Sequence, residues 1–209
     1  MGFSMMIDIA GSIIIGSLLL LILFRMNDNA SRNTYRFSGE LVMQENLVTT
    51  VEVLEYDFRK IGYCEDPIHI PNPARAILKA DSTSITYLTD INFDGTVDTV
   101  EYQLGPTSEL TVTPNPNDRM LYRIVNGRKT GINLGVTYFK IKYFDILSNE
   151  LMPPLSVPTG IASMEIDIEV QNTSSYGSEY NQTNKKYQQA YNRAFWRQIR
   201  LASRNLDNR

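Results

Sequence analysis

The side chains best placed for chemistry lie in the segment DINFDGTVDTVE, which runs from Asp90 to Glu101. Its spacing satisfies the calcium-loop pattern D-x-[DN]-x-[DN]-G-x5-E, in which oxygen ligands surround a hard cation and a glycine turns the chain. The predicted Ca²⁺ ligands are Asp90, Asn92, Asp94, Asp98 and Glu101. Both flanks are strand-like, however, whereas an EF-hand loop lies between helices. The alternative is a β-hairpin turned at Asp94-Gly95, where Asp and Asn suit the turn conformation.

Few other residues could support catalysis. His69 is the only histidine, so a histidine metal pair cannot form, and Cys64 is the only cysteine, so redox chemistry lacks a second thiol. No phosphate-binding loop, GxSxG or CxxC motif occurs. The net charge of -3 gives no basic field to gather nucleic acid. We therefore expect a protein that is not an enzyme and does not bind nucleic acid.

The N-terminus has the length and composition of a membrane anchor. Ile9–Phe24, with the sequence IAGSIIIGSLLLLILF, carries no charge, and Met5–Ile7 extend the apolar stretch upstream of Asp8. About 20 helical residues cross the hydrocarbon of a bilayer. A cleaved signal peptide is the poorer interpretation, because no Lys or Arg precedes the apolar stretch. We therefore expect a transmembrane anchor over residues 1–26.

Asp8 is an unusual residue for such a helix, because a carboxylate inside hydrocarbon costs about 3 kcal/mol on insertion scales. One interpretation places Asp8 at the level of the lipid headgroups. The other pairs Asp8 with the α-amino group of a neighbouring subunit in a bundle of similar helices. Small residues would allow such helices to approach closely, and they are Gly11, Ser12, Gly16 and Ser17.

Residues 27–62 predict an amphipathic continuation of the helix, with a possible break in the polar stretch 27–33. Apolar residues recur here at intervals of three or four, the spacing of one stripe that packs on a sheet or on another helix. The stripe consists of Met43, Leu47, Val51, Leu54, Phe58 and Ile61. Glu55 and Arg59 stand four apart and can pair. Gly62 ends the helix.

Residues 63–209 predict a β-rich head domain, because the hydrophobic period changes to two after Pro73. The expected strands are 84–88, 96–104, 109–113, 120–125, 136–144 and 163–170. The polar segment 172–191 is expected to be a flexible loop. The C-terminal segment admits a basic helix, an amphipathic helix on the membrane surface, or a last strand around 195–202. The fold class is α+β, with a long N-terminal helix packed on an antiparallel β-sheet.

Two of the expected strands have complementary charges. In TYFKIKYF, Lys140 and Lys142 alternate with apolar residues, and in MEIDIEV the acids Glu165 and Asp167 do the same. We therefore expect these strands to be antiparallel neighbours, with the lysines facing the acids.

The N-terminal sequence GFSMMIDIAGSIIIG resembles that of a type IV pilin or pseudopilin, in which a peptidase cuts after a glycine, a phenylalanine follows, and an acid lies a few residues into the helix. The rest of the chain is similar to W-type minor pilins and J-type minor pseudopilins. The similar stretches are VLEYDFRKIGYCED, DINFDGTVDTVEYQLG, LYRIVNG, GVTYFKIKYFD, GIASMEIDIEV and RLASRNL. The resemblance favours a strand at the C-terminus and implies processing between Gly2 and Phe3.

The resemblance also implies a function. The chain would be a structural subunit of a type IV filament or secretion machine, held in the inner membrane by one helix with its head in the periplasm or in an extracellular filament. Its partners would be membrane lipid and other pilin-like subunits, contacted through Phe3, Asp8, Gly11 and Gly16. The positive-inside rule would instead keep the head cytoplasmic, because the anchor is followed by Arg25, Arg32 and Arg36. The alternative function is a membrane-tethered, non-enzymatic binding module of the cell envelope.

Overall fold

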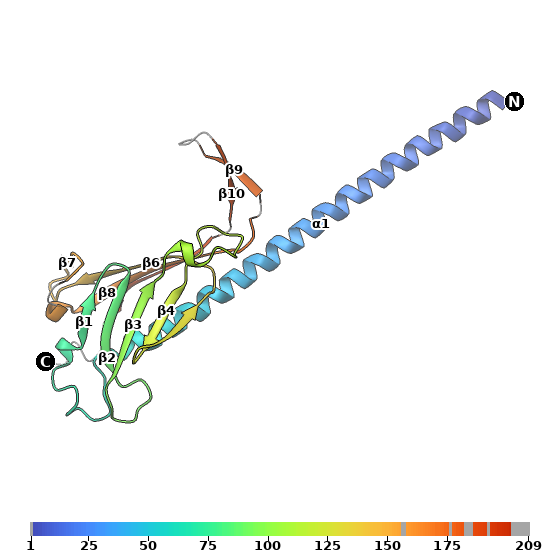
Figure 1. Ribbon diagram of the computed structural model, residues 1–209. Helices are drawn as coiled ribbons and strands as arrows, with labels where there is room; N and C mark the ends of the chain where they lie inside the picture. Colours follow the sequence, from blue (N-terminus) through green and yellow to red (C-terminus); the bar gives the residue numbers. More distant parts are fainter. Residues whose placement is uncertain (1, 156–157, 176, 182–185, 192, 202–209) are drawn as a thin grey trace. The chain divides into compact units, whose positions relative to one another are not determined.

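The computed structural model describes residues 2–155, 158–175, 177–181, 186–191 and 193–201 (Figure 1). The chain divides after Leu41 into two compact units. A single helix, α1 (Gly2–Arg59), supplies the first unit and the beginning of the second. The predicted helix therefore continues from the apolar segment, and the polar stretch 27–33 does not interrupt it. It ends at Arg59, three residues before the predicted end, and Gly62 follows with a φ of 73°.

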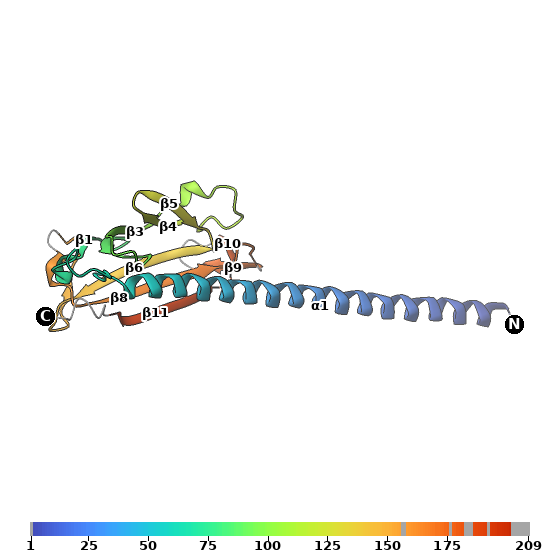
Figure 2. The same ribbon diagram turned by 90° about the horizontal axis from the view of Figure 1, so that it is seen from below.

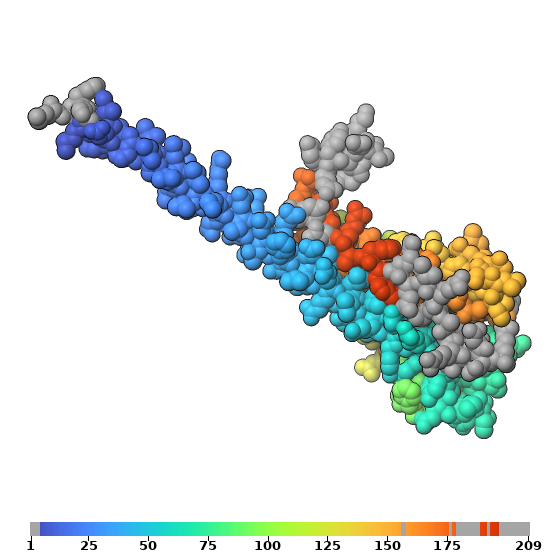
Figure 3. All heavy atoms as spheres, turned by 180° about the vertical axis from the view of Figure 1, so that it is seen from behind, coloured from blue at the N-terminus to red at the C-terminus, as the bar shows by residue number. Residues whose placement is uncertain are grey.

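The first part of α1 is long and apolar enough to span a membrane once. Its most apolar stretch has a mean hydropathy of 2.5, and none of that stretch is buried against protein (Figure 3). The Ser12 hydroxyl donates to the Asp8 carbonyl at 2.7 Å, and the Ser17 hydroxyl donates to the Ile14 carbonyl at 2.8 Å. Because these hydroxyls bond within the helix, neither needs water as a partner.

The second unit contains two larger antiparallel sheets and a separate hairpin. The first sheet has the strand order β1 (Ile77–Ala80), β2 (Ser84–Thr89), β3 (Asp98–Leu104), β4 (Leu121–Val125) and β5 (Arg128–Ile132). The second has the order β11 (Arg193–Leu201), β8 (Ser163–Gln171), β6 (Val136–Phe144) and β7 (Glu150–Leu151). The hairpin pairs β9 (Gly177–Asn181) with β10 (Lys186–Ala190). Short 3-10 helices occupy Pro73–Arg75, Thr107–Glu109 and Pro158–Gly160.

The core of the second unit lies between α1 and the two larger sheets (Figures 1 and 2). On the helix side, Met43, Leu54, Phe58 and Ile61 are buried, and Leu47 and Val51 are partly buried against them. The predicted stripe is therefore confirmed as the packing face. The Phe58 ring lies 5.4 Å from the Tyr102 ring and 5.8 Å from the Tyr87 ring, centroid to centroid. The fold is α+β with the helix packed on sheet, as predicted.

The expected pairing of the two charged strands is confirmed. Strands β6 and β8 are antiparallel neighbours, with Lys140 opposite Asp167 and Lys142 opposite Glu165. The Lys142 Nζ lies 2.6 Å from the Glu165 Oε1. The C-terminal segment forms strand β11 on the other edge of β8, which agrees with the expected last strand. Residue 202 of that prediction lies outside the described residues.

Two sequence predictions are wrong. Residues 109–113 form no strand: Glu109 is the last residue of a 3-10 helix, the residues after it lie in turns, and Val112 is 94% exposed. Strand propensity reflects the fit of a side chain to a pleated, half-buried surface, and this segment has no such surface to join. The expected loop 172–191 contains strands β9 and β10, whose backbones pair with each other. Residues 176 and 182–185 of that segment lie outside the described part of the chain.

Candidate functional site

The loop between β2 and β3 is organised around Asp90, whose side chain is completely buried. The Asp90 carboxylate accepts hydrogen bonds from the backbone N–H groups of Glu65 (3.2 Å), Asp94 (3.2 Å) and Gly95 (2.9 Å). Gly95 has a φ of 78°, which a residue without Cβ adopts readily. Asp90 therefore joins this loop to the segment that follows α1.

Burial alone would raise the pKa of Asp90, but backbone N–H donors outweigh it and hold the pKa below the ordinary value. The ionised carboxylate is thus the form that the folded head favours. The pKa of Asp90 is lower in the folded head than in the unfolded chain, where it is about 3.9. The stability that this pKa difference supplies is therefore fully present above about pH 4. It is lost as the pH falls from about 4 through the lower folded pKa.

We expect Asp90→Asn to lower the stability of the head at pH 7 and to flatten its dependence on pH below about 5, because the amide cannot be ionised. Urea unfolding midpoints at pH 7, 5, 4 and 3 measure both effects. The matched control is Glu150→Gln, because Glu150 is an exposed residue of strand β7. An Asp90→Asn variant that loses stability in acid as steeply as the wild type would contradict the stabilising role of the ionised Asp90 carboxylate.

The remaining predicted ligands also bond within the protein. The Asp94 Oδ1 accepts from the Thr96 backbone N–H at 2.8 Å, and the Asp94 Oδ2 accepts from the Asn92 amide at 2.7 Å. Both bonds bend the loop locally, as Asp and Asn side chains do in turns. Hydrogen bonding to Thr96 and Asn92 lowers the pKa of Asp94.

Asp98 and Glu101 belong to strand β3. The Asp98 carboxylate accepts from the Ile91 N–H at 3.0 Å and from the Asn126 amide at 2.7 Å, and Glu101 pairs in register with Thr86. Within the described ranges, no group of three or more His, Cys, Asp or Glu side chains is arranged to hold a metal ion. The structure therefore does not bring the five predicted calcium ligands together, and the β-hairpin alternative describes the segment.

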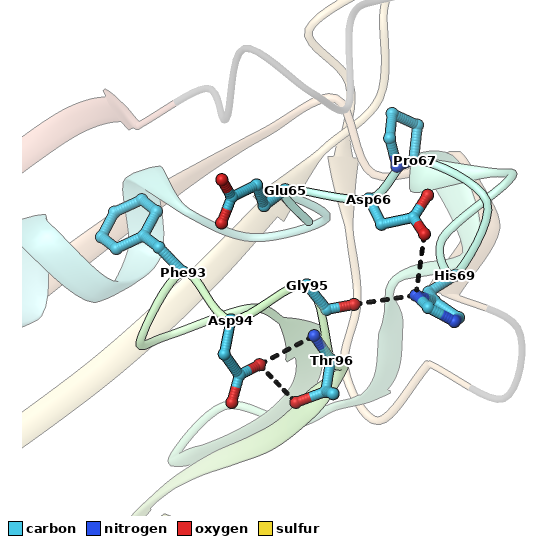
Figure 4. A pocket seen from close by; sticks show the side chains of 8 residues that line it. All are labelled: Glu65, Asp66, Pro67, His69, Phe93, Asp94, Gly95 and Thr96. Atoms are coloured by element: carbon cyan, nitrogen blue, oxygen red, sulfur yellow. Dashed lines mark hydrogen bonds and ion pairs between the residues drawn. The ribbon is translucent and has the colours of Figure 1, made fainter.

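A groove of about 560 Å³ lies beside this loop (Figure 4). Its lining consists of Glu65, Asp66, Pro67, His69, Phe93, Asp94, Gly95 and Thr96. The His69 Nδ1 lies 2.8 Å from the Gly95 carbonyl oxygen and 3.7 Å from the Asp66 carboxylate. Because a carbonyl can only accept, Nδ1 carries the proton in this contact. His69 thus links the two loops that form the groove.

The nearby thiol is not an activated nucleophile. Cys64 is buried, with its Sγ 3.5 Å from the Gly95 carbonyl oxygen. Burial raises the pKa of the thiol, and the acids around it add to this effect. Since the thiolate is the reactive form of cysteine, this environment opposes nucleophilic chemistry.

A buried polar cluster that the sequence patterns did not predict joins α1 to the first sheet. The Asp57 carboxylate lies 2.6 Å from the Arg123 Nε and 2.6 Å from the Tyr102 hydroxyl. Asp57 is only 1% exposed and Tyr102 is completely buried. The Asp57 hydrogen bond raises the pKa of Arg123, while burial is the main cause of a raised pKa at Tyr102. This cluster fixes the helix against strands β3 and β4.

The predicted assembly residues lie on the first part of α1, which begins at Gly2 and includes Phe3. Asp8 is exposed in this helix. A methyl group added at Gly11 or at Gly16 would meet no atom within 4 Å beyond its chain neighbours and the adjoining helix backbone. The two glycines therefore leave space on the helix surface that another helix could occupy.

Comparison with known proteins adds no relative. No protein-family model matches the sequence. A search of curated proteins also finds no match. The functional inference below therefore depends on the residues and on the fold.

Proposed function

We propose that this chain is a non-catalytic structural subunit, a minor pilin or pseudopilin-like component of a type IV filament or secretion machine. The observation that carries the proposal is the division of α1. Its first part is apolar and has no protein packed on its most apolar stretch, whereas residues 42–59 supply the helical side of the head core. Such a helix can enter a bundle of similar helices while it carries a folded head.

The polar and small residues of the apolar segment support assembly rather than anchoring alone. A carboxylate in hydrocarbon is expensive unless a countercharge neutralises it, and the amino terminus of a neighbouring subunit would neutralise Asp8. Gly11 and Gly16 allow the close backbone approach that such a contact requires. In this proposal the chain crosses the inner membrane once, and its head lies in the periplasm or in an extracellular filament.

Cysteine cross-linking of the full-length chain in its native cells tests the proposal. The parent variant is Cys64→Ser, which removes the only native thiol. Gly11→Cys and Gly16→Cys are then introduced singly. A thiol-reactive photo-crosslinker is attached to each new cysteine, because the partner need not carry a thiol. After illumination we expect both variants to be linked to the N-terminal helices of pilin-like subunits. Asp8→Ala should lower the yield of these cross-links, because the buried countercharge is lost.

The matched control is Asp28→Ala. Asp28 is also an exposed acid of α1, but it pairs with Arg32 at 3.0 Å and lies after the apolar segment. Its replacement should leave the yield unchanged. A chain that fractionates with the membrane but gives no cross-link from Gly11 or Gly16 would contradict the proposal and favour a membrane-tethered binding module.

A further inference from the structure

A second and smaller groove lies on the head beside the second sheet, and we call it the polar groove. Its volume is about 300 Å³, and every side chain of its lining is polar or aromatic. The lining includes Asn117, Arg119, Thr137, Tyr138, Glu169 and Gln171. Sites for small ligands are usually lined mainly by apolar side chains. A lining of this kind therefore indicates a ligand that carries many hydrogen-bonding groups.

Strands β6 and β8 supply one side of the polar groove (Figure 2). Tyr138 stands directly opposite Glu169 in this antiparallel pair, so both side chains project from the same face of the sheet. Gln171 lies two residues after Glu169 in β8 and shares that face. The intervening Val170 and the preceding Ile168 are completely buried in the core. The polar groove therefore opens on the outer face of the second sheet.

The side chains of the polar groove are held in place by one another. The Glu169 Oε1 accepts hydrogen bonds from the Gln171 amide at 2.7 Å and from the Thr137 hydroxyl at 3.1 Å. The Gln171 Oε1 accepts in turn from the side-chain amide of Asn115 at 3.1 Å, and Asn115 is completely buried. Because these groups are already ordered, a ligand that contacts them loses little affinity to their immobilisation.

Arg119 and Glu169 bring opposite charges to the polar groove, and both are half-buried. No hydrogen bond or ion pair holds the Arg119 guanidinium within the part of the chain that the structure describes. An anion would be attracted by Arg119 but repelled by Glu169, and a cation would meet the reverse. A guanidinium only donates hydrogen bonds and a carboxylate only accepts them. A neutral ligand with hydroxyl groups, which do both, therefore satisfies the two side chains together.

The aromatic rings on this face favour a sugar as the neutral ligand. Tyr138 is 41% exposed, and its ring offers a flat apolar surface beside the polar groups. The C–H groups on one side of a pyranose ring form a matching surface. Phe195 of β11 stands opposite Glu169 on the other side of β8 and is 52% exposed. The strands that carry the two rings lie about 10 Å apart, twice the spacing of neighbouring strands, which leaves room for linked sugars.

We infer that the polar groove binds a neutral oligosaccharide, with one pyranose ring on Tyr138 and with its hydroxyl groups bonded to Arg119 and Glu169. The linked sugars extend across β8 towards Phe195. The inference goes beyond the proposed function, because none of these residues belongs to α1. A subunit with this site would carry a saccharide-binding surface on its head.

Ligand-observed NMR titration of the full-length chain tests the inference. The protein is kept in a detergent without a sugar headgroup, so that the detergent does not compete for the site. Maltotriose and cellotriose probe chains of glucose, and tri-N-acetylchitotriose probes the amino sugars found in cell walls. We expect at least one of them to bind in the millimolar range or more tightly. If none binds at millimolar concentration, the inference is wrong.

Substitutions locate the bound saccharide. Tyr138→Ala should weaken its binding about tenfold, because the stacking contact is lost, whereas Tyr138→Phe should retain it. Arg119→Ala should cause a similar loss. The matched control is Phe93→Ala, which removes a ring that is 49% exposed in the other groove and should leave the affinity unchanged.

Three results would overturn the inference even if a saccharide binds. They are an unchanged affinity in Tyr138→Ala, displacement of the saccharide by inorganic phosphate, which would indicate an anion site, and displacement by glycine, which would indicate a site for zwitterions. Cross-linking from Gly16 does not involve the polar groove. Its outcome therefore separates a failure of this inference from a failure of the proposed function.

Discussion

Asp57→Ala is expected to destabilise the head by about 2 to 4 kcal/mol, because the buried Tyr102 hydroxyl and the Arg123 guanidinium, 27% exposed, both lose their acceptor. The side chain is 1% exposed and lies 2.6 Å from both the Arg123 Nε and the Tyr102 hydroxyl. Alanine would leave the charge of Arg123 and the hydroxyl of Tyr102 without this acceptor. Since both partners belong to the first sheet, the helix would lose its main polar attachment. Chemical unfolding of the full-length chain in detergent measures the loss.

The control for this prediction is Glu52→Ala, an exposed acid in the same helix whose loss should change stability by less than about 0.5 kcal/mol. A double-mutant cycle with Arg123→Ala separates the pair from its surroundings. We expect the double variant to be less destabilised than the sum of the two single variants, because each single variant leaves one charge without its partner and the double variant leaves none. If the two single losses of stability simply add in the double variant, Asp57 and Arg123 are not energetically coupled and the prediction is wrong.

Phe58→Ala is expected to destabilise the head by about 3 to 5 kcal/mol, because it removes buried apolar surface and leaves a cavity. Phe58 is completely buried, and its ring stacks 5.4 Å from that of Tyr102 and lies 5.8 Å from that of Tyr87. Its removal leaves a cavity between helix and sheet that two fixed tyrosines cannot fill. The denaturant midpoint of unfolding measures this effect.

The matched control for Phe58 is Tyr56→Ala on the other side of the same helical turn, where the side chain is 54% exposed. Its loss should be close to neutral for the fold, and Phe58→Leu should cost less than Phe58→Ala. Equal midpoints for the Phe58 and Tyr56 variants would show that the stripe does not hold the helix to the sheets.

Much of this architecture could be predicted from the sequence, because local periodicity determines which face of an element is buried. The spacing of Leu54 and Phe58 indicated the packing face of α1, and the alternation in 136–144 and 163–170 indicated both strands and their pairing. The failures have physical causes. The hairpin of β9 and β10 carries polar side chains without an apolar period, so its backbone pairing leaves no hydrophobic pattern in the sequence.

The candidate sites were harder to predict than the fold. The Asp90 segment matched a calcium pattern because turns and calcium loops use the same residue types, Asp, Asn and Gly. The structure distinguishes the two because Asp98 and Glu101 belong to strand β3, and no three acids cluster to hold a metal ion among the described residues. The Asp57 cluster had no sequence signal at all. Its partners Tyr102 and Arg123 lie 45 and 66 residues away in the sequence. A contact between residues so far apart produces no local pattern that could predict it.

The partner that a thiol at Gly16 captures in whole cells tests the central claim most directly. A thiol-reactive photo-crosslinker is attached to the Gly16→Cys, Cys64→Ser chain, the cells are illuminated, and the linked product is purified so that its second peptide can be identified by mass spectrometry. We expect that peptide to come from the apolar N-terminal helix of a pilin-like subunit, with a lower yield when Asp8 is also replaced by alanine. A membrane-bound chain that gives no linked product, with or without Asp8, would contradict it.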